Sequence, residues 1–179
     1  MNSFQINNLL VHFHPSDNQE TDKLLDYLNG LSTESKKRFG PHPFTKEYIS
    51  QLLHDDYNYL LYTAKTQNEQ QVVAYTILKR GWLDFEYPRL KSYGLTPSEG
   101  DLTIAPSVAD AWQGKGLGSS FLQYVIYHVK QIQGARRLIL WGGVQSDNIK
   151  AVRLYQKVGF RTIGQFEYNG SNLDMLLVL

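Results

Sequence analysis

Gln113-Gly-Lys-Gly-Leu-Gly-Ser-Ser120 lies between an apolar run that ends at Val108 and a segment with apolar residues at helical spacing. The N-terminus of a helix has unsatisfied N–H donors and a partial positive charge, so it binds phosphate groups well. Glycine at every second position removes the side chains that would block such a group, and Lys115 adds a flexible positive charge. The stretch therefore predicts a strand, an anion-binding turn and a helix.

Two common phosphate-binding loops do not fit this spacing. A Walker loop requires Ser or Thr after its lysine and a glycine upstream, but Gly116 follows Lys115 and Ala109 holds the upstream position. The dinucleotide pattern G-x-G-x-x-G would place its third glycine at Leu117 or Phe121. A tight turn that binds no ligand is the remaining alternative if this stretch is taken alone.

A second motif, N-x-x-A-x-x-L-Y-x-x-x-G-F, runs from Asn148 to Phe160. Together with Q-x-x-G-x-G from Gln113 to Gly118, it resembles the GCN5-related N-acetyltransferase (GNAT) superfamily over about Leu102 to Leu179. The resemblance implies an α/β (α+β) fold, in which a twisted, mixed, mainly antiparallel sheet has helices on both faces. We expect residues 1–179 to form a single domain of this kind, since this length is usual for one core.

The resemblance also implies the reaction. We expect the protein to move an acetyl group from acetyl-CoA to a primary amine of a small molecule or peptide by direct attack. The turn would bind the pyrophosphate of CoA, and the backbone near Val108 would pair with its pantetheine arm. The predicted cofactor-binding residues are Val108, Gln113, Gly114, Lys115, Gly116, Leu117, Gly118, Ser119 and Asn148. Pro106 cannot donate to a β-ladder, which favours an interrupted or splayed strand at this point.

The predicted catalytic residues are Tyr155 and Asp101. Tyr155 lies on an apolar stripe, which alone indicates core packing; the resemblance implies instead that its hydroxyl protonates the departing thiolate. An attacking ammonium must lose a proton, and Asp101, at the start of a strand, is our first candidate base, ahead of Asp84 and Glu86. Asn148 is also a suitable helix N-cap, and this role competes with a cofactor contact.

Composition excludes several other classes of protein. The absence of cysteine rules out disulfides and a cysteine acyl-enzyme, and a net charge of +1 gives no reason to expect nucleic acid as a partner. His12 and His14 lack further metal ligands at a recognisable spacing, so we expect no metal. With no signal peptide or membrane-spanning run, we expect a cytoplasmic protein that does not bind membranes.

The sequence fits more than one function and more than one oligomeric state. The alternative function is a CoA sensor or protein-interaction module without catalysis, and a homodimer is one alternative for the oligomeric state. The acceptor pocket could be formed by aromatic residues of the N-terminal half and of the segment 80–100, namely Phe39, His42, Phe44, Trp82, Phe85 and Tyr93.

Elsewhere the sequence predicts the remaining elements from local patterns. We expect a first strand within residues 5–14, three helices within residues 15–54, and a hairpin of residues 59–65 and 71–79. The segment 80–100 is predicted to be a loop, and strands follow at 101–108 and 137–141. Helices are expected up to about residue 133 and from about residue 148. The chain should end in a hairpin that turns at Asn169-Gly170.

Overall fold

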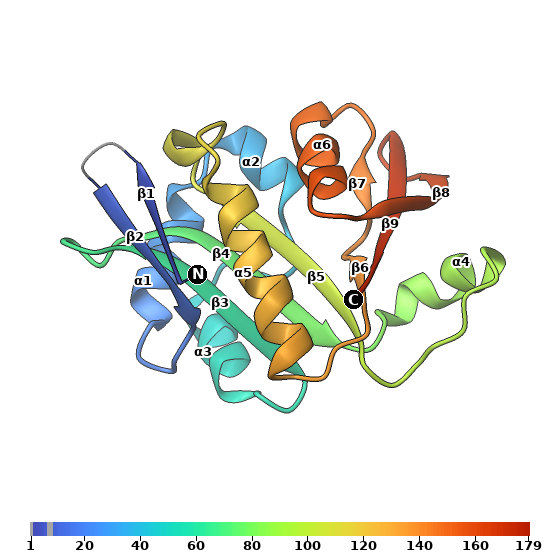
Figure 1. The fold of residues 1–179 in the computed structure, drawn as a ribbon, viewed down its shortest axis with the longest axis horizontal. Coiled ribbons are helices and arrows are strands. Elements are labelled where there is room, and N and C mark those ends of the chain that lie inside the picture. The colour runs from blue at the N-terminus through green and yellow to red at the C-terminus, as the bar shows by residue number, and fades with distance from the viewer. Residues whose placement is uncertain (1, 7–8) are drawn as a thin grey trace. The chain divides into compact units, whose positions relative to one another are not determined.

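The computed structural model describes residues 2–6 and 9–179, and the chain divides into two compact units (Figure 1). The first unit contains Met1–Ile77 and Ala105–Val125, and the second contains Leu78–Ile104 and Ile126–Leu179. Strands β4 (Val72–Arg80) and β5 (Asp101–Val108) and helix α5 (Leu117–Gln131) each contribute residues to both units.

The sheet of the first unit begins with a hairpin. Strand β1 (Ser3–Ile6) pairs antiparallel with β2 (Leu9–Pro15), which pairs antiparallel with β3 (Tyr59–Thr66); β4 is the next strand. The single strand predicted within residues 5–14 is therefore wrong in its extent, although residues 7–8 of that range lie outside the described part. Backbone N–H and C=O groups of β1 and β2 pair with one another. With a single strand at this edge, the groups of β2 that face β1 would lack these partners.

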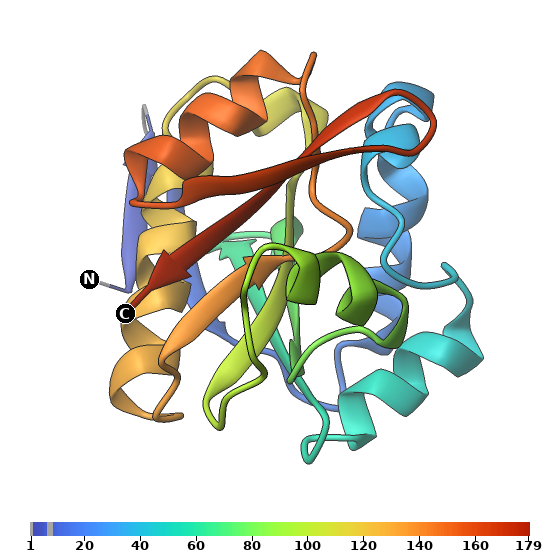
Figure 2. The same cartoon turned by 90° about the vertical axis from the view of Figure 1, so that its right-hand side faces the viewer.

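Helices pack on both faces of this sheet, as Figure 2 shows for α1 (Thr21–Gly30) and α3 (Lys46–His54) on one side and α5 on the other. Tyr75 of β4 contacts Tyr27 of α1, whereas Phe13 of β2 contacts Phe121 of α5. Ser32 caps the short helix α2 (Thr33–Arg38) by accepting the N–H of Ser35, and Thr45 caps α3 in the same way. The three predicted helices are confirmed.

The second unit is built on a parallel pair of strands. Strand β5 pairs with β6 (Arg137–Leu140), and β6 pairs antiparallel with β9 (Ser171–Val178). Strands β7 (Val144–Gln145) and β8 (Arg161–Glu167) both pair antiparallel with β9. Asn169 and Gly170, between β8 and β9, have φ angles of 50° and 105°, so the final hairpin and its turn are confirmed.

The segment predicted to be a loop contains two helical elements, η1 (Asp84–Glu86) and α4 (Tyr87–Ser92). Pro88 lies in the first turn of α4, where a missing N–H costs nothing, so it begins this helix and does not break it. Leu90 is fully buried and packs with Trp82, Ile139 and Leu176. The sequence prediction failed here because contacts with distant strands stabilise a helix that is too short to be recognised from its own pattern.

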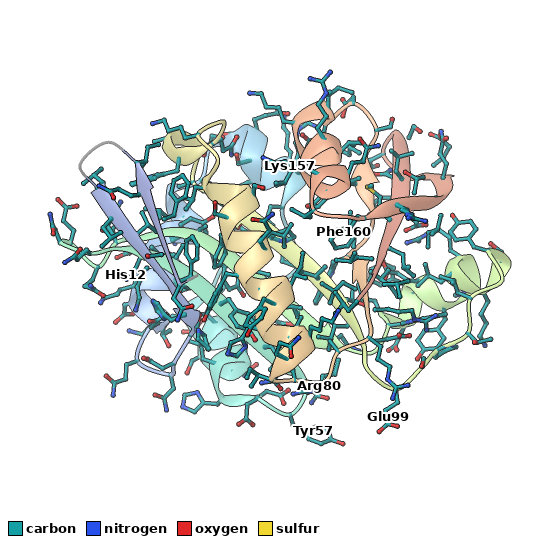
Figure 3. All side chains as sticks on the ribbon, in the orientation of Figure 1. His12, Tyr57, Arg80, Glu99, Lys157 and Phe160 are labelled. Carbon is teal, nitrogen blue, oxygen red and sulfur yellow. The ribbon has the colours of Figure 1, made fainter. Side chains whose placement is uncertain are left out.

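Helix α6 (Ile149–Lys157) follows β7, and Phe160 comes just after its end, as Figure 3 labels. Among the described residues, no helix combines the length and the apolar character that crossing a bilayer would require.

Candidate active site

The turn between η2 (Asp110–Trp112) and α5 exposes its backbone. Residues 113–116 are exposed, whereas Leu117, the first residue of α5, is fully buried. Gly114 and Gly116 have φ angles of 72° and 89°, in the left-handed region that residues with side chains rarely adopt. A side chain at Gly114 would meet nothing within 4 Å, so the surface of the turn is open.

The first amides of α5 are the donors that this turn presents. Ser120 N donates to Gly116 O at 3.2 Å. Leu117, Gly118 and Ser119 precede Ser120 in the sequence and form the first turn of α5. The first N–H groups of a helix have no acceptor within the helix. These donors, the helix dipole and the exposed Lys115 form a site suited to a phosphate group.

Asp110 fixes the beginning of the turn. Its Oδ2 accepts the N–H of Ser32 at 2.9 Å, and its Oδ1 accepts the hydroxyls of Ser32 at 2.7 Å and Ser35 at 2.6 Å. These bonds, that of the Ser35 hydroxyl first, lower the pKa of Asp110. The sequence reasoning missed Asp110 because its partners are 75 or more residues away, and no local pattern connects them.

The side chain of Gln113 folds back onto the preceding strand. Its Nε2 donates to the carbonyl O of Val108 at 3.0 Å and to Ser35 Oγ at 3.4 Å. The next residue after Val108, Ala109, donates its N–H to Val73 O of β4 at 2.9 Å. The structure thus brings the predicted residues Val108 and Gln113 together, and the Gln113 amide holds the turn in shape.

Strand β5 continues beyond the end of its parallel partner. Its pairing with β6 ends where Ile104 lies opposite Leu140, and Trp141 N donates to Ile104 O at 2.9 Å. Pro106 is two residues farther along β5, in the part that extends past β6. Strand β5 itself runs unbroken through Pro106 to Val108, and only its pairing with β6 has ended there; a splayed strand at Pro106 stays a prediction.

Two predicted residues, Asn148 and Tyr155, belong to the second unit. Asn148 caps α6 by accepting the N–H of Ala151 at 3.3 Å, which is the local role that competed with a cofactor contact.

The Tyr155 ring lies 5.7 Å from that of Phe160, and only 9% of the residue is exposed. Among the described residues, its hydroxyl has no hydrogen-bond partner. Burial raises the pKa of Tyr155, so the phenol stays protonated at neutral pH.

Asp101, the first candidate base, accepts four hydrogen bonds. Arg137 donates to Oδ1 through Nε at 2.7 Å and to Oδ2 through Nη2 at 2.6 Å. Oδ2 also accepts the indole N–H of Trp82 at 2.8 Å and the backbone N–H of Ser98 at 3.0 Å. Oδ2 accepts three of these four bonds and Oδ1 accepts one, so the carboxylate is held from several sides. The contacts therefore give Asp101 a structural role and do not support its assignment as the base.

Glu86 is buried with far fewer partners. The residue is fully buried, and its Oε1 accepts the N–H of Gly142 at 2.7 Å and the Nη2 of Arg89 at 3.3 Å. Oε2 is buried too, without a hydrogen-bond partner among the described residues. Desolvation raises the pKa of Glu86 to about 7, and the nearby Asp174 contributes a smaller increase. The sequence ranked Glu86 below Asp101 because burial and partners do not appear in a local pattern.

The aromatic residues proposed for an acceptor pocket differ in exposure. Phe39 and His42 are each 8% exposed and Trp82 is 1% exposed, so these three belong to the core. His42 Nε2 lies 3.2 Å from the Tyr75 hydroxyl, inside the first unit. Phe85, in contrast, is 64% exposed and remains available for contact with another molecule.

The two histidines considered for a metal site, His12 and His14, belong to β2, and His14 Nδ1 lies 3.8 Å from Glu20 Oε1. His12 is exposed, and His14 Nδ1 lies 3.0 Å from the carbonyl O of Pro15. No group of three or more His, Cys, Asp or Glu side chains within residues 2–6 and 9–179 could hold a metal ion.

Residues 24–160 match the family model described as Acetyltransferase (GNAT) family. The chain is 35% identical over 66 residues to a spermine/spermidine N(1)-acetyltransferase of Bacillus subtilis. The matched residues make up 37% of this chain and 42% of that protein. It is 43% identical over 53 residues to a mycothiol acetyltransferase of Corynebacterium efficiens, or 30% of this chain and 17% of the relative. The matches thus span less than half the length of these relatives.

Solved structures resemble this one over nearly the whole chain. The GNAT domain of S. lividans PAT superposes with a TM-score of 0.71 at 19% identity, covering 99% of this chain and 97% of that one. AAC(6')-Ib in complex with parmomycin and acetyl-CoA superposes with a TM-score of 0.68 at 18% identity, covering 94% and 93%. At these identities the likeness establishes the fold, which is the mixed, mainly antiparallel sheet with helices predicted from the sequence.

Replacing Asp101 tests its structural role. Asp101→Asn should lower the free energy of unfolding by roughly 3 kcal/mol, because it leaves the Arg137 charge and several donors without their anion. Urea unfolding measures this loss, and Asp84→Asn at an exposed position of η1 is the control. A stable Asp101→Asn protein that has lost only its catalytic activity would restore Asp101 as the base.

Glu86 should make stability depend on pH. Its pKa rises from 4.5 to about 7 on folding, so the protonated carboxyl contributes stability that is complete below pH 4.5 and is lost as the pH rises through 7. At about 1.4 kcal/mol per pH unit, wild type should lose roughly 3 kcal/mol relative to Glu86→Gln over this range. Denaturant unfolding at pH 4 to 8 measures the difference, which would stay constant if Glu86 did not titrate in this range.

Proposed function

Because the chain belongs to the Acetyltransferase (GNAT) family, we propose that it is an N-acetyltransferase, which moves an acetyl group from acetyl-CoA to a primary amine of a small molecule or peptide. The observation that carries this proposal is the exposed turn before α5, with its two left-handed glycines and the free amides of Leu117, Gly118 and Ser119. A doubly charged pyrophosphate fits such a set of donors.

The residues of the first unit would hold the cofactor. The backbone from Gly114 to Ser119 would bind the pyrophosphate, with Lys115 as an additional charge. The part of β5 that extends beyond β6, up to Val108, would pair with the amides of the pantetheine arm as a neighbouring strand does. Acetyl-CoA supplies an activated thioester, so a serine or cysteine acyl-enzyme is unnecessary.

Tyr155 would serve as the proton donor to the leaving thiolate. Burial keeps its phenol protonated, and no neighbour among the described residues takes up its hydrogen bond. The Tyr155 oxygen is not among the enclosed side-chain atoms of the described residues that lack a partner, so the hydroxyl keeps access to solvent or a ligand although the ring is buried. The ring contact with Phe160 fixes the side chain from one side.

The proposed acceptor is an amine that carries a positive charge at neutral pH. The B. subtilis relative is named for spermine and spermidine, which supports testing polyamines first. A net charge of +1 over the whole chain gives no general attraction for cations, so a local carboxylate would have to provide it. Amino sugars, amino acids and peptide N-termini complete the panel of amines to be tested for release of free CoA.

Acetyl-CoA should stabilise the protein through the turn. A ligand at a concentration of about 100 times its Kd adds roughly 2.7 kcal/mol to the free energy of unfolding. For a chain of this length, this raises the Tm by about 5–10 °C. Gly116→Glu should abolish this shift, because it adds a side chain and a like charge at the pyrophosphate site.

The matched control is Gly134→Glu. Gly134 lies beyond the other end of α5, with a φ of 66° and no neighbouring atom within 4 Å of the place a Cβ would occupy, so this change brings the same strain and charge away from the turn. Both variants should lose intrinsic stability, but only Gly134→Glu should keep the shift. A full shift in Gly116→Glu would exclude the turn as the cofactor site.

Removing the Tyr155 hydroxyl separates catalysis from packing. Tyr155→Phe should lower the rate of the chemical step by on the order of 10² and leave acetyl-CoA binding unchanged. Because the hydroxyl has no described partner, the free energy of unfolding should change by less than about 1 kcal/mol. Single-turnover kinetics measures the rate, with Tyr127→Phe at a 64% exposed position as the control. An unchanged rate in Tyr155→Phe would remove the phenol from the mechanism.

A further inference from the structure

A pocket lies between the end of α3 and the start of β3, within the first unit. Its volume of about 120 Å³ has room for several water molecules, and its lining residues are Tyr48, Gln51, Leu52, Asp55 and Tyr59. The first four recur at helical spacing, so they share one face of α3 and its C-cap. Only Leu52 is buried, and the pocket is therefore reached from solvent.

The carboxylate in this pocket has no cationic partner among the described residues. Asp55 accepts hydrogen bonds only from Asn58, through the backbone N–H at 3.1 Å and through Nδ2 at 3.0 Å, and both donors are neutral. Residues 47–64 contain three acidic side chains and no lysine or arginine. Lys46, just before them, is held by Asp22 at 2.7 Å. The charge of Asp55 thus favours a cationic ligand.

Two tyrosine rings form walls that suit such a ligand. The face of an aromatic ring attracts an ammonium group that lies within about 6 Å of its centre. Tyr48 stacks on His42, with ring centroids 5.7 Å apart, which holds the Tyr48 ring in place. Burial lowers the pKa of His42, so this ring is neutral at pH 7 and does not repel a cation. Burial also raises the pKa of Tyr59, and Tyr48 and Asp55 raise it further because they are close to its hydroxyl.

The pocket also offers hydrogen-bond acceptors that are not in use. The hydroxyls of Tyr48 and Tyr59 have no hydrogen-bond partner among the described residues, and Oδ2 of Asp55 accepts one bond only. A primary ammonium group has three N–H donors, whereas a quaternary one has none. These free oxygens therefore favour a primary ammonium over a quaternary one.

The pocket and the proposed cofactor site lie at opposite ends of β3. At one end, Thr66 N donates to Gln71 O at 3.0 Å where β3 turns into β4. Two residues farther along β4, Val73 O accepts the N–H of Ala109 at 2.9 Å, next to the strand end proposed for the pantetheine arm. Tyr59 begins β3 seven residues before Thr66, a distance of about 23 Å along a strand. A ligand in the pocket would thus be separate from the cofactor.

We propose that this pocket binds the ammonium group of a primary alkylamine, as a second site at which the amine does not react. The ring faces of Tyr48 and Tyr59 and the carboxylate of Asp55 hold the charge. Gln51, exposed at the rim, leaves the pocket open to solvent. Binding at this site does not depend on the acetyl transfer proposed above.

The test is a titration of the full chain with ethylammonium chloride, followed by the NMR signals of the Tyr48 and Tyr59 rings. We expect saturable shifts of both rings in the millimolar range of ethylammonium. Sodium chloride at equal ionic strength and 1-propanol, a neutral molecule of similar size, should not produce them. The same shifts with sodium chloride or 1-propanol would overturn the inference.

Two neighbouring aspartates provide a matched pair of variants. Asp55→Asn removes the charge from the pocket but keeps an oxygen that accepts the N–H of Asn58, so it should fold and raise the Kd of ethylammonium roughly fivefold. Asp56→Asn makes the same change at an exposed residue that does not line the pocket, and should leave the Kd nearly unchanged. An equal loss of affinity in both variants would show general attraction by surface charge and would overturn the inference.

A lysine in the pocket tests the site without removing any of its charged groups. In Gln51→Lys, the new ammonium group reaches Asp55, four residues later on the same helix face, and should abolish binding of ethylammonium. Gln67→Lys adds the same charge at an exposed position just beyond the other end of β3 and should keep the wild-type Kd. Unchanged binding in Gln51→Lys would exclude the pocket as the site.

Kinetics distinguishes a separate amine from the far end of a long acceptor. With butylamine and 1,4-diaminobutane as acceptors, Asp55→Asn should leave both KM values unchanged if the bound amine is a separate molecule, as the distance to the cofactor site favours. A higher KM for 1,4-diaminobutane alone would keep the ammonium site but assign it to the acceptor. This comparison alone rests on the proposed acetyl transfer. If neither amine is acetylated, the binding titrations still decide the inference.

Discussion

The ion pair between Asp101 and Arg137 sets the arrangement on which the candidate site depends. Both oxygens of Asp101 receive the guanidinium of Arg137, and the two residues lie opposite each other at the start of the parallel pair β5–β6. Parallel strands have no turn to fix their register, so a charged pair at this position helps to define it. Three residues later Ile104 meets Leu140 and β6 ends. The register thus determines where β5 continues beyond its pairing with β6 and where Gly142 presents its N–H.

Much of the fold could be predicted because its signals are local. Ser32, Thr45 and Asn148 each cap a helix by accepting the N–H of the residue three positions later, and Asn169-Gly170 adopts the positive φ angles that its turn requires. The turn before α5 is also a local feature, because the start of the helix, the glycines and the lysine follow one another directly in the sequence. Each of these features depends on residues a few positions apart, and such distances are visible in a sequence.

Features that depend on distant residues could not be predicted. Helix α4 forms because Leu90 is buried against strands that follow some fifty or more residues later, and the loop prediction therefore failed. The hydrogen bonds by which Asp110 anchors the turn to Ser32 and Ser35 cannot be recognised from a local sequence pattern either. The roles of the candidate bases also depend on distant residues. In the sequence, Asp101 and Glu86 both lie at or near the expected strand. Only the fold shows that Asp101 binds an arginine, whereas Glu86 accepts the N–H of Gly142.

The contrast between these two carboxylates shows how one fold assigns different chemistry to similar side chains. Both are almost completely shielded from water, so both lose the solvation that stabilises an anion. Four hydrogen bonds, two of them from a guanidinium, replace that solvation for Asp101 and give it a structural role. For Glu86 the replacement is incomplete, since Arg89 serves Asp174 more closely and Oε2 receives no donor from the described residues. An anion that is stabilised only in part retains affinity for a proton, and desolvation accordingly raises the pKa of Glu86 to about 7.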